Sequence, residues 1–104
     1  MNKLTNKELK KLESVFTKIQ RDIENGINTL FTSPPIRVAK VWKRDQGGGG
    51  KSISITGDTI EKAAINFSSI SGKQLPQSSI AEELKTKSYK FHAMGVSVIA
   101  HPMN

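Results

Sequence analysis

The sequence contains no cysteine, which excludes disulfide bonds, thiolate zinc sites and cysteine nucleophiles. It has no run of about 18 apolar residues that could span a bilayer. Its first residues, from Met1 to Lys7, lack the apolar core of a signal peptide. A chain of 104 residues is long enough for one domain with a modest core. We therefore expect a single domain, residues 1–104, in the cytoplasm.

Acidic residues are scarce as well. Nine Asp and Glu stand against sixteen Lys and Arg, so the formal net charge is +7. Such an excess of cations predicts an anionic partner: nucleic acid, an anionic membrane surface, or a polycarboxylate or phosphorylated small molecule.

The first predicted element is a helix from about Thr5 to Leu30. Thr5 and Glu8 have the spacing of a capping box, which satisfies backbone N–H groups at a helix start. Gly26 interrupts the apolar seam, so a helix packed on a sheet is favoured over a coiled coil. The apolar residues recur at three- and four-residue steps on one face: Leu9, Leu12, Phe16, Ile19, Ile23, Ile27 and Leu30.

Alternating patterns after the helix predict a mostly antiparallel sheet and an α+β fold, with the N-terminal amphipathic helix packed on that sheet. Gly57-Asp58 is expected to form a two-residue hairpin in which glycine supplies a positive φ. A second capping box, Ser79 to Glu82, predicts a short helix before the final strand. The predicted strands cover residues 36–42, 52–56, 59–70 and 91–101.

Four consecutive glycines, Gly47 to Gly50, precede Lys51 and invite comparison with a phosphate-binding loop. The comparison fails, because Asp45 stands where the Walker A pattern needs glycine and an alternating strand follows instead of a helix. The sequence therefore predicts a mobile glycine loop between strands and no nucleotide site.

The last stretch, Phe91 to Asn104, is the most apolar and is predicted to be a buried strand. Alternation places Gly95, Ser97, Ile99 and His101 on one face. A hydroxyl and an imidazole beside a glycine could line a pocket floor. The simpler interpretation, that both are hydrogen-bonded structural residues, remains open.

Four sequence blocks together resemble the oxygen-dependent coproporphyrinogen III oxidases. The resemblance runs from the first helix to the last residue. It covers only the N-terminal part of longer proteins, so we expect a truncated portion of that family's larger sheet, which carries helices on both faces. The blocks are VWKRDQGGGG at 41–50, IEKA at 60–63 with NFS at 66–68, FHAMGVS at 91–97, and HPMN at 101–104.

This resemblance implies an enzyme of haem biosynthesis that oxidatively decarboxylates two propionates of coproporphyrinogen III to vinyl groups, giving protoporphyrinogen IX. Dioxygen is the electron acceptor and no organic cofactor is needed. In this family Ser97 matches a substrate-contacting serine, and His101 matches a histidine assigned to a divalent metal. The family's proton-donating histidine would lie beyond Asn104, so the chain alone is expected to be inactive. The family pairs into homodimers, and self-association is expected here.

Basic residues concentrate beside the glycine run, and Arg44 and Lys51 are the ones we expect to face a carboxylate-rich substrate. Two alternatives stay open. One is a small nucleic-acid-binding module, although Trp42 and Phe67 do not form the interleaved aromatic and basic platform of single-strand binders. The other is a non-enzymatic remnant or interaction domain.

Overall fold

The computed structural model describes residues 4–72 and 91–103. They form one helix and four strands, which confirms the α+β class. The short helix predicted from Ser79 to Glu82 lies outside the described residues. The elements are α1 (Asn6–Asn28), β1 (Ile36–Lys43), β2 (Gly48–Thr56), β3 (Ile60–Gly72) and β4 (Phe91–Pro102).

Helix α1 begins as the sequence predicts. Thr5 is the N-cap: its Oγ1 accepts from the Glu8 backbone N–H at 3.1 Å, and the Glu8 carboxylate accepts from the Thr5 N–H at 2.9 Å. This hydrogen bond from the backbone of Thr5 holds the pKa of Glu8 below its usual value. The helix ends at Asn28, two residues before the predicted Leu30, and Thr29 caps it through a hydrogen bond from its hydroxyl to the Gly26 carbonyl.

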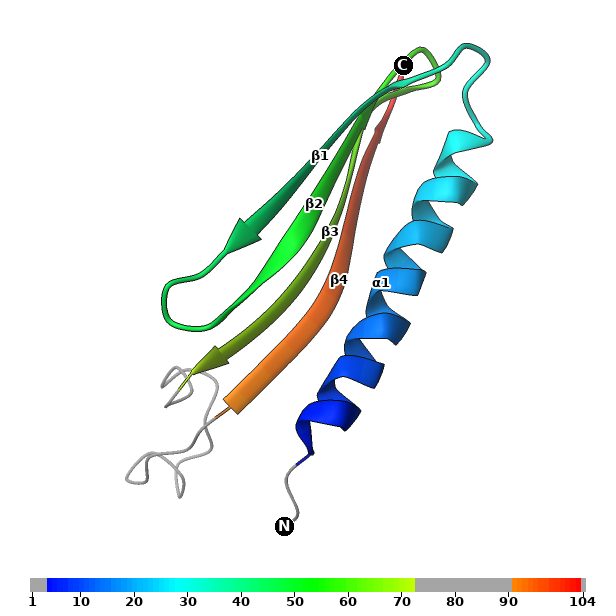
Figure 1. Cartoon of the computed structure of the whole chain (residues 1–104). Coiled ribbons are helices and arrows are strands. Elements are labelled where there is room, and N and C mark those ends of the chain that lie inside the picture. Colours follow the sequence, from blue (N-terminus) through cyan, green and yellow to red (C-terminus); the bar gives the residue numbers. More distant parts are fainter. Residues whose placement is uncertain (1–3, 73–90, 104) are drawn as a thin grey trace, which may run out of the picture.

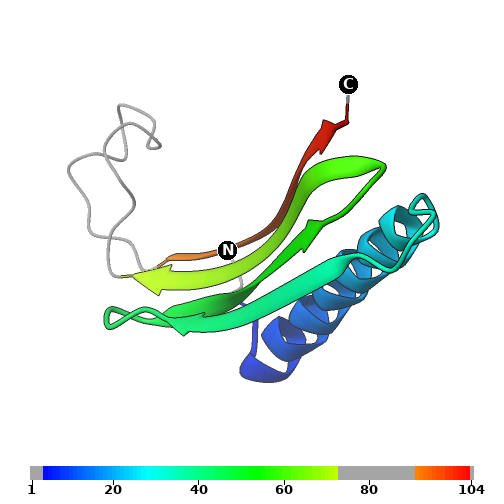
Figure 2. The same ribbon diagram turned by 90° about the horizontal axis from the view of Figure 1, so that it is seen from above.

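The four strands form one sheet in the order β1-β2-β3-β4, and every neighbouring pair is antiparallel. Figure 1 shows α1 running along one face of the sheet, next to β3 and β4, and Figure 2 shows the strands curving past it. Because consecutive antiparallel strands are neighbours in the sheet, short hairpins are enough to connect β1 to β2 and β2 to β3.

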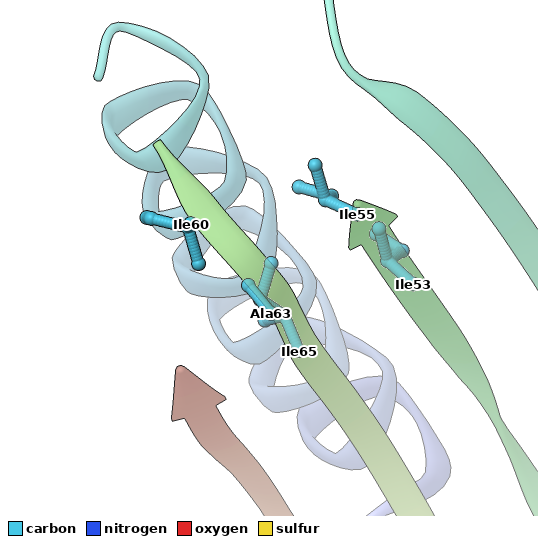
Figure 3. Packing of buried hydrophobic residues seen from close by; sticks show 5 residues of the cluster. All are labelled: Ile53, Ile55, Ile60, Ala63 and Ile65. Carbon is cyan, nitrogen blue, oxygen red and sulfur yellow. The ribbon is translucent and has the colours of Figure 1, made fainter. Parts of the chain in front are cut away.

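The hydrophobic core lies between α1 and the two central strands (Figure 3). Ile55, Ala63 and Ile65 are fully buried, and Ile53 and Ile60 are nearly so. Ile53 and Ile55 on β2 and Ala63 and Ile65 on β3 are two residues apart, so they project to the same face, which α1 covers. The bulge between Ile60 and Lys62 inserts one residue and brings Ile60 to that face as well. The predicted shared face of Ala63, Ile65 and Phe67 is confirmed. Partly buried side chains that pack against this core are Ile23, Ile27, Phe31 and Val96.

The predicted apolar stripe of α1 is only partly correct. Leu12 and Ile19 remain 37% and 40% exposed, whereas Gln20 and Glu24 are buried at 3% and 6%. The side of α1 that faces the sheet is therefore rotated away from the predicted apolar stripe and toward Gln20 and Glu24. Both of these side chains form hydrogen bonds with residues of the sheet. A polar group that is hydrogen-bonded can be buried at little net cost, and periodicity alone does not reveal such partners.

The prediction that β4 is buried is wrong. β4 is the outermost strand described, and Val98 and Ile99 on its two faces are 43% and 57% exposed. Its apolar, β-branched sequence correctly predicts a strand. Burial, however, also requires a neighbouring strand or a covering layer on each side, and among the described residues β4 pairs only with β3.

The predicted mobile glycine loop is also wrong. Gly48, Gly49 and Gly50 belong to β2; Gly49 and Gly50 pair with both neighbouring strands, and Gly48 pairs with β3. Gly47 and Gly48 have positive φ, 122° and 93°, and the tight connection closes through hydrogen bonds between Arg44 and both glycines. Backbone pairing on both sides outweighs the ordering cost of glycine.

The turn between β2 and β3 differs from the prediction in its glycine. Gly57 does not have a positive φ; among the described residues only Gly47 and Gly48 do. A Cβ at Gly57 would lie 2.5 Å from the Phe31 ring, so glycine is required there by close packing. No helix among residues 4–72 and 91–103 is long and apolar enough to cross a membrane.

Candidate functional site

The face of the sheet turned away from α1 carries Ser97 and His101. Directly opposed residues of antiparallel strands project to the same face. Ile65 is buried under α1 and pairs with Val98, whereas its neighbour Asn66 pairs with Ser97. Ser97 therefore lies on the other face, which we call the open face because no described element packs on it. The predicted face-sharing of Gly95, Ser97, Ile99 and His101 is confirmed.

Ser97 and His101 are both exposed. They are four residues apart on one strand, about 13 Å at about 3.3 Å per residue, so they can contact only different parts of a ligand. His101 pairs with Lys62 across the strands. It lines a shallow hollow together with Thr56, Glu61 and Lys62 at one end of the sheet.

The residues around His101 do not complete a metal site. Within the described ranges no group of three or more His, Cys, Asp and Glu side chains is placed to hold an ion. The hollow offers one imidazole and the carboxylate of Glu61, with the ammonium group of Lys62 beside them. A divalent ion at His101 would need further ligands.

Lys51 and Arg44 are not brought together with Ser97. Lys51 pairs with Val41 and Phe67, which places it on the face that α1 covers, and its carbonyl accepts from the Gln20 amide at 2.8 Å. Arg44 follows the end of β1. Its guanidinium donates to the Ser71 carbonyl and the Gln46 side chain, both at 3.0 Å, and so fastens the glycine turn to the end of β3.

Arg37, another cation near the glycine run in the sequence, also points to the α1 side. It donates two hydrogen bonds to the carboxylate of Glu24 on the helix. These bonds raise the pKa of Arg37 above its usual value. The sequence places these cations close together, but the sheet divides them between its two faces.

A partly buried polar network centred on Ser69, under α1, has no counterpart in the sequence-based predictions. The Ser69 hydroxyl, 5% exposed, donates to Glu13 Oε1 at 2.8 Å and lies 2.7 Å from His92 Nε2. The same residue types form nucleophilic triads, but there the histidine sits between serine and acid. Here serine sits between them, so the network joins α1, β3 and β4 structurally. Its members are 23 and 56 residues apart, and no local pattern indicates such a contact.

Comparison with known proteins identifies the family. The model of the coproporphyrinogen III oxidase family matches residues 11–104. The chain belongs to this family. It is 36% identical over 95 residues to an oxygen-dependent coproporphyrinogen-III oxidase of Prochlorococcus marinus subsp. pastoris, covering 90% of this chain and 28% of that protein. For the enzyme of the same name from strain MIT 9515 the identity is 32% over 100 residues, covering 95% of this chain and 29% of the relative.

A third relative, the oxygen-dependent coproporphyrinogen-III oxidase of Prochlorococcus marinus strain AS9601, is 44% identical over 64 residues, which are 61% of this chain and 19% of that protein. The chain thus spans less than a third of the length of these oxidases. No solved structure matches it significantly.

Proposed function

We propose that this chain forms the substrate-binding sheet of an oxygen-dependent coproporphyrinogen III oxidase, with the open face as the surface on which the porphyrinogen lies. The observation that carries the proposal is the position of Ser97, which is exposed on the open face within a segment matched by the family model. A hydroxyl in this position can donate to a carboxylate or accept from a pyrrole N–H.

The proposed reaction removes each of two propionate carboxylates as carbon dioxide. Two electrons and one proton leave the side chain with it, a vinyl group forms, and dioxygen takes the two electrons and two protons to become hydrogen peroxide. One of these protons must come from outside the substrate. Because the porphyrinogen is electron-rich, no flavin, haem or nicotinamide is required, and the protein's part is to bind, orient and manage protons and charge.

Ser97 is the substrate contact in this proposal. His101 would supply one ligand to a divalent ion, whose other ligands the described residues do not provide, so no step of the proposed reaction is assigned to a metal. Arg44 takes part indirectly, by holding the turn at one end of the open face. Lys51 lies on the opposite face, so the open-face proposal gives it no contact. Self-association into a homodimer belongs to the same proposal.

The test is a titration of the 104-residue chain with coproporphyrin III, the stable oxidised form of the substrate, followed by porphyrin fluorescence. Replacing Ser97 with Ala should weaken binding about fivefold, the effect of losing one hydrogen bond of about 1 kcal/mol. The melting temperature should stay unchanged, because the side chain is exposed. Unaltered affinity with a large loss of stability would show that Ser97 is structural.

Turnover is measured separately, with coproporphyrinogen III under air and chromatographic detection of vinyl products. We expect none from the chain alone, since the proton donor is expected outside it. Vinyl formation at the rate of a full-length oxidase would place the whole catalytic apparatus within these 104 residues.

A further inference from the structure

The pairing register places four hydrogen-bonding side chains in one row across the open face. Lys40 of β1 pairs with Ser52 of β2, Ser52 with Asn66 of β3, and Asn66 with Ser97 of β4. We call these residues the polar row. Lys40 and Ser97 are exposed at its ends, and Ser52 and Asn66 are half-buried at its centre. None of the four side chains makes a hydrogen bond or ion pair with another side chain or carbonyl within the described residues.

The adjacent row is flat at its centre and aromatic at one end. Trp42 pairs with Gly50, Gly50 with Ser68, and Ser68 with Gly95. The Trp42 ring lies against Gly50, where an added Cβ would be 2.6 Å from the ring. At Gly95 an added Cβ would meet nothing within 4 Å. Small side chains at the centre leave room for a planar ligand, and an aromatic ring at the edge offers it an apolar contact.

Along the polar row the only charged side chain is the cation Lys40. β1, β2 and β4 contain no Asp or Glu, and β3 contains only Glu61, which lies at the bulge near its start and lines the hollow beside His101, away from the polar row. The open face carries Lys40 and Lys62 from the strands. A ligand with carboxylates would therefore meet ammonium and hydroxyl donors without a facing carboxylate along the polar row.

From these observations we infer that the binding site extends from Ser97 along the polar row, and that Lys40 binds a propionate carboxylate on the far side of the macrocycle. This inference rests on the proposed function and deepens it. Three inter-strand steps of about 4.8 Å make the row about 14 Å long. That span matches a tetrapyrrole with carboxylate arms on opposite sides, so Ser97 and Lys40 contact opposite edges of one ligand. Ser52 and Asn66 face the ring between them, and Trp42 packs beside it.

Two variants of the full chain test this site with coproporphyrin III. Replacing Lys40 with Gln removes the charge that we assign to a propionate and should weaken binding about tenfold. Replacing Gly95 with Leu adds bulk on β4 two residues from Ser97, where it should block the ligand from the Ser97 end of the row and reduce binding beyond detection. The Gly95 position is sterically open, so the Leu variant should melt as the wild type does; Gly95→Ala, a smaller addition at the same position, provides a graded second variant.

The matched control is Lys11→Gln, which removes one exposed cation from α1 and leaves the open face intact. Equal effects of Lys40→Gln and Lys11→Gln would show that only net charge matters and would overturn the assignment of Lys40. The wild type should also prefer coproporphyrin, with four carboxylates, over protoporphyrin, with two, and Lys40→Gln should reduce that preference.

The outcomes separate this inference from the proposed function. Tight binding that is blocked by Gly95→Leu but indifferent to Lys40→Gln would leave the open face as the site and overturn the polar row. Binding that survives Gly95→Leu would place the ligand elsewhere and overturn both, as would the absence of coproporphyrin binding by the wild type.

Discussion

Arg37 of β1 donates two hydrogen bonds to the carboxylate of Glu24 of α1, one of them from Nη2 to Oε1 at 3.2 Å. Glu24 is 6% exposed, whereas the Arg37 side chain is 45% exposed. The pair links β1, the outermost strand on one side of the sheet, to the helix, whose backbone comes closest to β3 and β4. A buried carboxylate of this kind depends on its one cationic partner.

Replacing Arg37 with Ala should therefore destabilise the fold by about 1–3 kcal/mol, because it leaves the Glu24 carboxylate buried without its partner. The figure is below that of a fully buried pair since half of Arg37 faces water. Urea unfolding followed by circular dichroism measures the change. Replacing both residues, Arg37 with Ala and Glu24 with Leu, should recover much of the loss.

Lys18→Ala is the matched control. Lys18 and Asp22 also form an ion pair, at 2.8 Å, but their side chains are 66% and 57% exposed. Removing such a pair should cost about 0.5 kcal/mol or less. Equal losses in the two variants would mean that burial of Glu24 plays no part in the stability of the fold.

Two glycine substitutions should have effects of opposite sign. Gly48 has φ of +93°, and an added Cβ would lie 2.1 Å from the Ser69 carbonyl oxygen, so Gly48→Ala should destabilise the fold by roughly 2 kcal/mol or more. At Gly26, in α1, an added Cβ would meet nothing within 4 Å. Gly26→Ala should stabilise it by about 0.5–1 kcal/mol, since alanine favours the helix. Thermal melts of both variants test these predictions. If Gly48→Ala left the melting temperature unchanged, the positive φ at Gly48 would be contradicted.

Local signals in the sequence predicted the elements well. The Thr5–Glu8 capping box, the alternation in the four strands and the hairpin connections depend on neighbours along the chain, and each is present in the structure. The main errors concern burial. Gln20 and Glu24 are buried because carbonyls and a guanidinium more than ten residues away satisfy them, and β4 is exposed because of its position at the edge.

The residues of the candidate site also fall into those that local pattern predicted and those that it did not. Alternation along one strand was enough to place Ser97 and His101 on a common face, and the pairing register confirms this. The register itself, however, joins residues of four strands, and no local pattern indicates that Lys40 and Asn66 lie in line with Ser97. The sequence also grouped Lys51 with the other cations beside the glycines, although strand pairing turns Lys51 to the α1 side.

Asp58 makes stability depend on pH in the acid range. Its carboxylate accepts from the Thr32 hydroxyl, the Thr59 hydroxyl and the Ser33 backbone N–H, and the bond from Thr32 contributes most to holding the pKa of Asp58 below its usual value. A lowered pKa in the folded state adds stability above the ordinary Asp pKa of about 3.9, and that contribution is lost as the pH falls through the lowered value.

Asp58→Asn should therefore lower the melting temperature at pH 6, and the difference from wild type should shrink as the pH falls below about 4, the ordinary Asp pKa. Melts at a series of pH values measure it. Glu8, whose pKa is also lowered, is present in both proteins and does not affect the comparison. A difference that stays constant down to pH 2 would mean that the Asn side chain fails for steric reasons and that ionisation of Asp58 contributes nothing.

The two outer strands differ in how their edges are protected, and this difference predicts where copies associate. β1 carries Arg37, Lys40 and Lys43, and charged residues on an edge strand hinder the addition of another strand. β4 carries no Lys, Arg, Asp or Glu in its 12 residues. Among the described residues it pairs on one side only, so its free edge offers backbone N–H and C=O groups beside exposed apolar side chains.

We expect self-association of the chain through β4, and one pair of variants can locate it. Val38 and Ile99 stand at opposite ends of a single cross-strand row, both on the open face, 48% and 57% exposed. Ile99→Lys places a charge on the β4 edge and should shift the mass measured by light scattering toward the monomer. Val38→Lys adds the same charge to the same row at β1 and should leave the mass unchanged. If Val38→Lys dissociates the protein and Ile99→Lys does not, association runs through β1; a wild type that is monomeric at about 100 μM would show that the β4 edge does not recruit a second copy at all.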